Sequence, residues 1–182
     1  MEKEWDIVEV LRHSRHDWLN KLQLIKGNLD LNRIDRAKAI IDEIVVEAQN
    51  ETKLSNLQLP HFASLLMKAN WENYFFQLEY EILQDTGAIS IDEHELVSWT
   101  SLFFSSLNSA VAMFEENQLA ITIVPLKEGA RFFFDFHGII KKKERIEQFL
   151  TDVSRLTMET TVKEFSELEL ALEVFSPQQQ QG

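Results

Sequence analysis

The sequence predicts an α+β protein, in which an N-terminal helical hairpin dimerises into a four-helix bundle and an α/β sandwich domain follows. Two observations lead to this prediction. Residues 5–57 contain one glycine and no proline, and their apolar residues recur every three or four positions, as in long amphipathic helices. After Leu59 the chain changes to short apolar runs, turn signals and helical segments in alternation, an order typical of a sheet covered by helices.

The hairpin is predicted from two helical segments, residues 5–31 and 35–57, which are separated by the polar break Asn32–Arg33. Asp35 is a candidate N-cap of the second helix. A connection this short makes the two helices antiparallel neighbours. Each helix has an apolar side, formed by Val8, Leu11, Leu19, Leu22, Ile25 and Leu29 in the first and by Ile34, Ala37, Ile41, Ile44 and Ala48 in the second. Because two helices alone leave much of this surface in water, we expect a homodimer that closes a four-helix bundle.

The second domain is expected to place helices on one face of a sheet. Its predicted elements are a helix at 61–70, a strand at 75–83, a buried helix at 97–116, hairpin strands at 118–126 and 130–138, an amphipathic helix at 141–156 and a second hairpin at 158–165 and 167–175. The glutamine-rich end is of low complexity and is predicted to be disordered. The expected organisation is therefore a hairpin domain at 1–58, a sandwich domain at 59–176 and a tail at 177–182.

Composition excludes several classes of function. The chain has no cysteine, which excludes disulfides, thiol nucleophiles and cysteine metal sites and suits the cytoplasm. No apolar run approaches the roughly 20 residues of a membrane span, and the acidic start is unlike a signal peptide, so no membrane association is expected. A net charge of −12 repels phosphate backbones, which makes nucleic acid a poor partner and a basic protein surface a better one.

The stretch HSRHDWLNKLQ, residues 13–23, raises the question of chemistry. At helical spacing a polar stripe runs opposite the leucines, formed by Glu9, His13, His16, Asn20, Gln23, Gly27 and Asp30. Such a stripe is most often a solvated helix face. However, Arg15 falls near the apolar side and Trp18 and Leu19 flank the polar cluster. A metal site at His13 and His16 lacks an evident third ligand, and Arg15 would oppose a cation, so no bound metal is expected.

Two motifs here resemble known families. The run HDWLN, residues 16–20, resembles the phospho-acceptor box of two-component histidine kinases. The longer HSRHDWLNKLQLIKGNL, residues 13–29, resembles the helical hairpin of the sporulation initiation phosphotransferase B family, and ETKLSNL (51–57) and DFHG (135–138) are also similar to it. The resemblance implies that His16 accepts a phosphoryl group from one response regulator and passes it to a second one, which controls sporulation. It gives His13 no acceptor role, only a supporting one.

The chemistry of the residue types agrees with this resemblance. A neutral imidazole is a competent nucleophile near neutral pH, and phosphoryl transfer needs positioning and charge neutralisation. Arg15 can supply a positive charge, to which Lys21 or Arg12 adds. Asp17 can hydrogen-bond the imidazole or contact the partner, and Asn20 can donate to the ring or to phosphoryl oxygens; simple solvation remains the alternative for both. With no acidic cluster of its own, the chain is expected to use no cofactor, and Mg²⁺ is expected on the partner response regulator.

The second domain resembles a degenerate ATP-binding domain of histidine kinases. That family holds ATP with an asparagine-rich helix, an Asp-x-Gly-x-Gly turn and a second glycine-rich loop. Here Asn108 is a lone candidate, DFHGII has one glycine, and KKKERIEQF follows where a glycine-rich lid belongs. Five glycines in the whole chain cannot build those loops, so we expect no use of ATP. Asp135, His137 and Gly138 are interpreted as a turn at the end of a strand.

The function predicted from sequence is that of a dimeric phosphorelay phosphotransferase with one acceptor, His16, in each subunit. Two alternatives remain. One is a histidine kinase that still uses ATP, which the missing glycine loops disfavour. The other is a non-catalytic dimeric scaffold that binds response regulators without accepting phosphate.

Overall fold

The computed structural model describes residues 5–84, 86–154 and 156–179 and has an α+β fold, as predicted. Two N-terminal helices precede a mixed five-stranded sheet with its own helices. By packing, the chain divides into two compact units, Met1–Gln49 and Asn50–Gly182. None of the helices in the described ranges is both long and apolar enough to cross a membrane.

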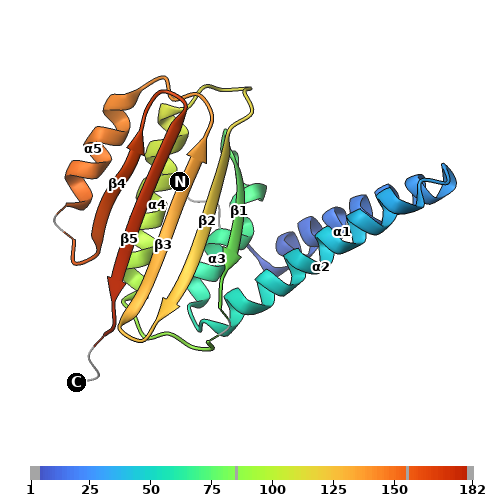
Figure 1. Ribbon diagram of the computed structural model, residues 1–182, viewed down its shortest axis with the longest axis horizontal. Helices are drawn as coiled ribbons and strands as arrows, with labels where there is room; N and C mark the ends of the chain where they lie inside the picture. The colour runs from blue at the N-terminus through green and yellow to red at the C-terminus, as the bar shows by residue number, and fades with distance from the viewer. Residues whose placement is uncertain (1–4, 85, 155, 180–182) are drawn as a thin grey trace. The chain divides into compact units, whose positions relative to one another are not determined.

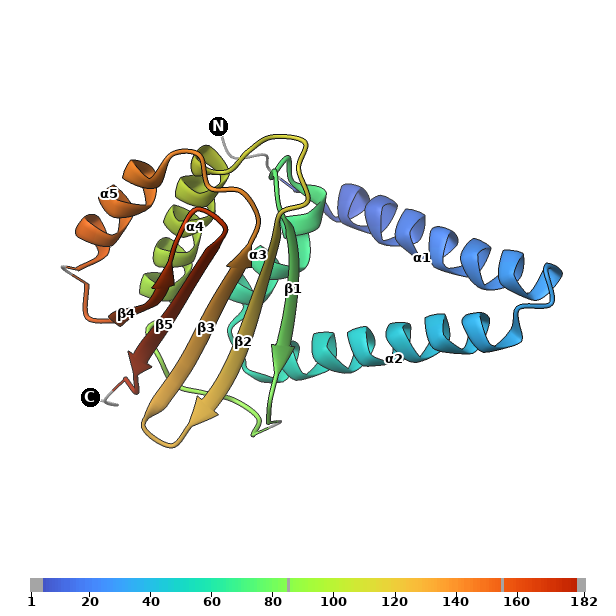
Figure 2. The ribbon, with the colours of Figure 1, turned by 45° about the horizontal axis from the view of Figure 1, so that its top comes forward.

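The first unit contains a helical hairpin, with bounds close to those predicted. Helix α1 spans Ile7–Asp30 and helix α2 spans Ile34–Asn56, so that the last turns of α2 belong to the second unit. The carboxylate of Asp6 caps α1 by accepting the Glu9 N–H at 2.8 Å. Asn32 takes a left-handed backbone with φ of 55° and turns the chain back, so that the two helices run antiparallel (Figures 1 and 2).

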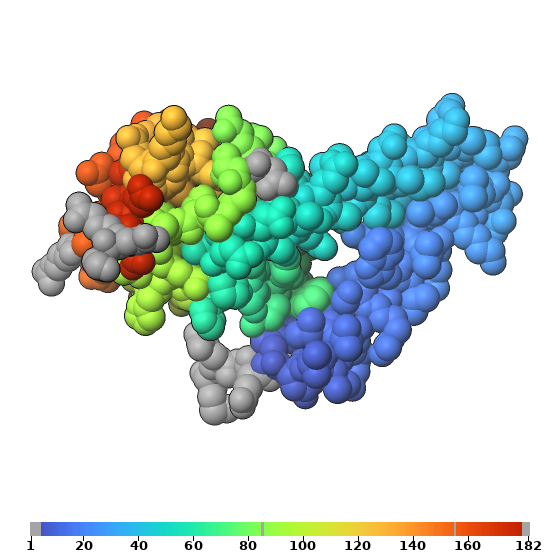
Figure 3. Space-filling view, turned by 90° about the horizontal axis from the view of Figure 1, so that it is seen from below, coloured from blue at the N-terminus to red at the C-terminus, as the bar shows by residue number. Residues whose placement is uncertain are grey.

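The hairpin buries little of its apolar surface within one chain. Helix α1 contains no buried residue, whereas Ala37 and Ile40 of α2 are buried. Figure 3 shows one face of this unit, in blue, with its side chains at the surface. The exposed apolar residues include most of the two predicted rows, among them Val8, Leu11, Leu19, Leu22, Leu29, Ile34 and Ile41. A surface of this kind is costly in water, and the predicted four-helix bundle would cover it.

The second unit is a five-stranded sheet with the strand order β1-β2-β3-β5-β4. Strand β1 pairs parallel with β2, and the other neighbouring strands are antiparallel. The strands are β1 (Gln77–Ile82), β2 (Gln118–Leu126), β3 (Gly129–His137), β4 (Glu159–Phe165) and β5 (Glu169–Pro177). Helices α3 (Pro60–Lys68), α4 (Glu93–Ala110) and α5 (Lys143–Val153) lie on one face of the sheet (Figures 1 and 2), and the short 3₁₀ helix η1 (Ala69–Trp71) follows α3.

An aromatic core joins this sheet to its helices. Alternate residues of β3 point into the core, so that Phe132, Phe134 and Phe136 are all buried. The ring of Trp99 on α4 lies 4.8 Å from that of Phe134 and 5.1 Å from that of Phe149 on α5. Large buried aromatic side chains contribute strongly to the free energy of folding, so this cluster anchors both helices on the sheet.

The helix predicted at 97–116 is wrong at both ends, because α4 begins at Glu93 and ends at Ala110. Its start is determined by Asp92, whose carboxylate accepts the Glu95 N–H at 2.9 Å. The spacing D-x-x-E is a capping signal that is visible in the sequence. The end has no such local signal.

Residues after Ala110 leave the helix because they pair elsewhere. Val111 forms an isolated bridge with Ile140, which lies far along the chain. Phe114 has φ of 63°, a left-handed backbone that cannot continue a right-handed helix. The apolar pattern through residues 111–114 therefore belongs to a loop and not to α4.

The predicted disordered tail begins at Pro177, which is instead the last residue of β5. The Gln179 N–H donates to the carbonyl of Ser90 at 2.9 Å, so ordered backbone pairing continues beyond the strand. Residues 180–182 lie outside the described part of the chain.

Candidate functional site

His16 projects from the middle of α1 with 72% of its side chain exposed. Its Nδ1 atom lies 3.3 Å from Nδ2 of Asn20, one helical turn further on, and 3.5 Å from Oδ1 of Asp17. The structure thus brings together three of the five predicted site residues. The i, i+4 spacing of a helix accounts for the contact between His16 and Asn20.

The contacts at Nδ1 bear on which ring nitrogen can react. An ionised carboxylate only accepts hydrogen bonds, so the approach of Asp17 favours a proton on Nδ1. The neutral imidazole then presents its lone pair on Nε2, the nitrogen that points away from Asp17 and Asn20. The Asn20 amide can present its nitrogen or, after a half-turn, its oxygen to Nδ1, so it fits either tautomer.

Of the predicted cations, Arg12 and Arg15 are both exposed on α1. At about 100° of rotation per residue, Arg12 lies one turn before His16 on nearly the same side of the helix. Arg15 points about 100° away from His16, toward the apolar row. Helix geometry therefore places Arg12, which sequence reasoning ranked behind Arg15, closer to the side of the acceptor.

Lys21 is held on a different side of α1. It forms an ion pair with Glu47 of α2, and its Nζ atom lies 5.8 Å from the centre of the Trp18 ring. Five residues after His16, Lys21 points about 140° away from it. The structure does not bring Lys21 to the imidazole. Sequence reasoning did not identify Glu47 because nothing local to α2 marks the pairing.

A half-buried stripe on α1 explains this orientation. Half-buried residues recur at the three- and four-residue spacing of one helix side: Val10, Ser14, Asp17, Lys21, Ile25 and Asn28. The Lys21–Glu47 pair identifies this side as the one nearest α2. Asp17 and Lys21 share the stripe, and His16 lies outside it, in solvent.

His13 lies apart from the cluster at His16. It is half-buried, and its ring contacts the edge of the Trp5 ring with 5.0 Å between the ring centres. This contact packs the first turns of α1. The supporting role predicted for His13 has no closer geometric counterpart here.

In the second unit, Asn108 and the turn at Gly138 have structural roles. Asn108 Oδ1 accepts the Phe75 N–H at 2.6 Å, which fixes the chain just before β1. Strand β3 ends at His137 and a bend follows at Gly138, as the strand-end interpretation predicts. A Cβ atom on Gly138 would lie 2.3 Å from Oδ1 of Asn117, so only glycine fits this close approach.

Asn117 is a buried residue that sequence reasoning missed. Its Nδ2 donates to the carbonyls of Phe75 at 2.7 Å and Ala112 at 2.8 Å, and its Oδ1 accepts the Ile139 N–H at 3.0 Å. One side chain thus ties together three segments that are distant in the sequence. An asparagine before a strand carries no sequence signal for this role.

No metal centre accompanies these sites in the ranges that the structure describes, where no group of three or more histidine or carboxylate side chains could hold an ion.

Solved structures share the general arrangement of elements at low sequence identity. A structure titled "1.7 Angstrom Structure of a Bacterial Phosphotransferase" is 12% identical, with 94% of this chain and 98% of that chain covered and a TM-score of 0.42. The Acinetobacter baumannii histidine kinase AdeS is 8% identical, with 91% and 98% covered and a TM-score of 0.46. The catalytic domain of histidine kinase ThkA is 8% identical, with 71% and 92% covered and a TM-score of 0.45.

Sequence comparison is more specific. The family profile described as "Sporulation initiation phospho-transferase B, C-terminal" matches residues 58–177, and "Sensor_kinase_SpoOB-type, alpha-helical domain" matches residues 1–57. Sporulation initiation phosphotransferase B of Bacillus subtilis (strain 168) is 38% identical over 135 residues, which cover 73% of this chain and 70% of that protein. The chain therefore belongs to the sporulation initiation phosphotransferase B family.

Proposed function

We propose that this protein is a phosphorelay phosphotransferase that moves a phosphoryl group between two response regulators through His16. The donor is a phospho-aspartate of one regulator, and the acceptor is an aspartate of a second regulator that controls sporulation. The observation that carries the proposal is the exposed His16, with Nδ1 beside Asp17 and Asn20, in a chain of this family.

The first transfer makes one bond and breaks another. The Nε2 lone pair of His16 attacks phosphorus, the N–P bond forms, and the P–O bond to the donor aspartate breaks to leave its carboxylate. The proton on Nδ1 stays in place, and the Asp17 carboxylate stabilises the positive charge that develops on the ring. In the second transfer the carboxylate of the receiving aspartate attacks phosphorus and the neutral imidazole leaves.

The surroundings of His16 support a supplementary role for nearby residues. A transferring phosphoryl group is stabilised by positive charge, and Arg12 and Arg15 are the exposed cations within one turn of His16. Asn20 can hydrogen-bond the ring or the phosphoryl oxygens. Mg²⁺ belongs to the acidic pocket of the partner regulator in this proposal, and the chain itself uses no cofactor.

The proposed assembly is a homodimer whose paired hairpins form a four-helix bundle with two acceptor sites, working in the cytoplasm. The apolar row left exposed on α1 and α2 supports this assembly. In a bundle the row faces inward, and His16, on the far side of α1 from it, stays open to a regulator.

A transfer assay tests the proposal. A receiver domain labelled on its aspartate with radioactive acetyl phosphate is mixed with this protein, and a second unlabelled regulator is then added. We expect label on this protein that is stable in base and labile in acid, as a phosphohistidine is, and its passage to the second regulator. A protein that binds the labelled receiver and never acquires label would instead be the non-catalytic scaffold.

A further inference from the structure

The ion pair between Lys21 and Glu47 links the two helices of the hairpin near the acceptor. Lys21 Nζ pairs with Glu47 Oε2, and the two side chains are 32% and 55% exposed. The Trp18 ring lies beside the same Nζ atom, at 5.8 Å. Lys21 is thus held toward α2, on the half-buried stripe that it shares with Asp17.

The position of Lys21 relative to Asp17 gives this pairing a consequence for His16. Asp17 and Lys21 are four residues apart with the acid first, the helical spacing and order at which opposite charges attract each other best. In the structure the Asp17 Oδ1 atom lies 3.5 Å from His16 Nδ1. A lysine drawn onto Asp17 would compete with the imidazole for that carboxylate.

We propose that Glu47 is a positioning residue for His16, because it holds Lys21 and thereby leaves the Asp17 carboxylate to the imidazole. The inference rests on the proposed function and adds a residue of α2 to it. Glu47 touches neither the phosphoryl group nor the reacting ring, and it acts through Lys21 and then Asp17. Lys21 accordingly serves the hairpin and not the phosphoryl group.

The competing explanation is that Lys21 itself neutralises the phosphoryl group, or that the ion pair only stabilises the hairpin. These explanations predict different orders of activity. If the pair is merely structural, Glu47→Gln and Lys21→Met remove the same interaction and lose the same activity. If Lys21 contacts the phosphoryl group, Lys21→Met is the more damaging change.

The test compares Glu47→Gln, Lys21→Met and the double variant in single-turnover transfer from the labelled receiver. Glu47→Gln frees Lys21 to pair with Asp17, so we expect the transfer rate constant at saturating donor to fall by roughly three- to fivefold, as the strength of exposed ion pairs allows. The donor concentration at half-saturation should not change. The double variant has no competing cation, and its rate constant should exceed that of Glu47→Gln and equal that of Lys21→Met.

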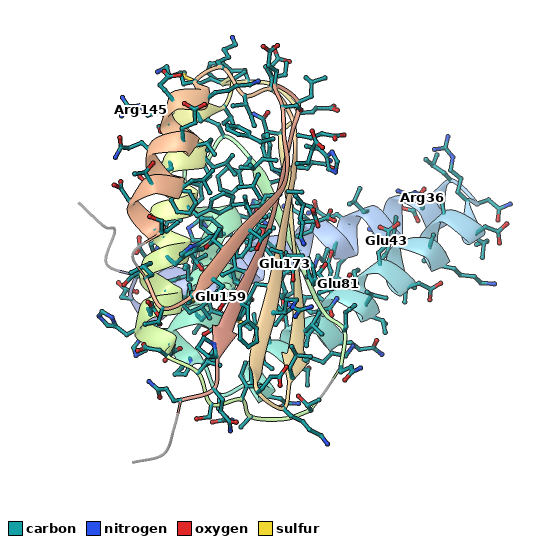
Figure 4. The ribbon with its side chains drawn as sticks, turned by 60° about the vertical axis from the view of Figure 1, so that its left-hand side comes forward. Arg36, Glu43, Glu81, Arg145, Glu159 and Glu173 are labelled. Carbon is teal, nitrogen blue, oxygen red and sulfur yellow. The ribbon has the colours of Figure 1, made fainter. Side chains whose placement is uncertain are left out.

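A matched control lies on the same helix. Arg36 and Glu43 form an ion pair within α2 at 3.6 Å, with both residues exposed (Figure 4). Glu43→Gln removes a carboxylate from an exposed pair without freeing a cation on α1, and it should transfer like the wild type. Circular dichroism checks that all variants keep their helices.

A double variant as slow as Glu47→Gln, or Lys21→Met slower than Glu47→Gln, would overturn the inference. Equal losses in the two single variants would also overturn it, in favour of a purely structural pair. Failure of the proposed function is a separate result, because the wild-type protein would then acquire no label from the receiver.

Discussion

At the scale of single residues, the exposure of His16 suits an acceptor that exchanges phosphate with other proteins. A buried nucleophile can react with a small substrate in a pocket, but an aspartate inside another folded domain must approach from outside. With 72% of its side chain exposed on a rigid helix, His16 can be reached without rearrangement of the hairpin. The helix also fixes Asp17 and Asn20 relative to the ring, which lowers the entropic cost of reaching the transition state.

Replacing the acceptor should separate chemistry from folding. We expect His16→Gln to abolish phosphate acceptance and to leave helical content and assembly unchanged, because this exposed side chain is not part of any buried packing. His13→Gln should retain substantial transfer, since His13 contacts Trp5. Radiolabel transfer and circular dichroism measure both effects. Transfer that survives in the His16 variant and is lost in the His13 variant would reverse the assignment.

Glu173 on β5 offers a prediction about pH. Lys163 hydrogen-bonds its carboxylate, with 2.7 Å between Nζ and Oε2, and Arg131 lies 3.1 Å away. The Lys163 hydrogen bond is the main cause of a pKa below the ordinary value of Glu173; burial opposes it, and the charges of Lys163 and Arg131 add to it. A carboxyl with a lowered folded-state pKa stabilises the fold above its unfolded pKa, and this stabilisation is lost as pH falls through the folded value.

We therefore expect Glu173→Gln to lower the melting temperature at pH 7 and to have a shrinking effect below about pH 4.5, the ordinary pKa of the group. Thermal melts of wild type and variant between pH 7 and pH 3 measure the difference. Glu159→Gln is the control, since Glu159 also lies on the sheet (Figure 4) and forms no ion pair within the described chain. An equal shift in melting temperature at every pH would contradict the argument.

At the scale of elements, the end of β3 is specified by close packing and not by a ligand. A Cβ on Gly138 would also lie 2.7 Å from Cζ of Phe136, besides its overlap with Asn117. We expect Gly138→Ala to lower the free energy of unfolding by about 1–3 kcal/mol, the usual cost of overpacking. Chemical denaturation measures it.

The control for that change is the same substitution at Gly27. No atom lies within 4 Å of a Cβ placed there, and Gly27 lies within α1. Gly27→Ala should therefore raise stability by roughly 0.5–1 kcal/mol through helix propensity. Equal effects at Gly27 and Gly138 would show that packing around Asn117 does not constrain the turn.

The loop after β3 also bears on nucleotide binding. The backbone N–H groups of Lys141 and Lys142 both donate to the carbonyl of Ala110, at 2.8 and 3.0 Å, and Ala112 N–H donates to Ile139. A short loop bonded onto the end of α4 lacks the glycine-rich backbone with which kinases surround phosphates. We expect no saturable binding of ATP at millimolar concentration with magnesium, and no autophosphorylation. Calorimetric binding, or label from γ-phosphate-labelled ATP alone, would favour the kinase alternative.

At the scale of the whole molecule, the exposed apolar rows predict self-association. Roughly 25 cal/mol is gained for each Å² of apolar surface removed from water, so covering these rows favours a dimer. Leu22 and Ile41 belong to the two rows, and both are exposed in the single chain. Joint replacement of both by Glu should give monomers or unfolded chains, and phosphotransfer should fall with the dimer content.

Sedimentation velocity at micromolar concentration measures this prediction, with Gln23→Glu as a control that adds charge on the polar side of α1. The control should remain dimeric, because Gln23 lies away from the apolar rows. A stable wild-type monomer with full transfer activity would contradict both the dimer and its part in the proposed mechanism.

Much of this protein was predictable from sequence because the deciding signals are local. Helical period set α1 and α2, alternation of apolar residues set the strands of both hairpins, and the HDWLN run identified His16 as the candidate acceptor. The contact between His16 and Asn20 is local as well, since both are on one helix one turn apart. These features need no knowledge of the rest of the chain.

Tertiary structure alone decided the features that join distant segments. Lys21 was expected beside the phosphoryl group, and its partner Glu47 is 26 residues away on another helix. The end of α4 depends on the bridge between Val111 and Ile140, and Gly138 is required because Asn117 is packed against it. Sequence patterns report the environment of a residue averaged over its near neighbours. A single ion pair, bridge or steric contact between remote residues depends on the packing of the whole unit, and so it becomes visible only in the folded structure.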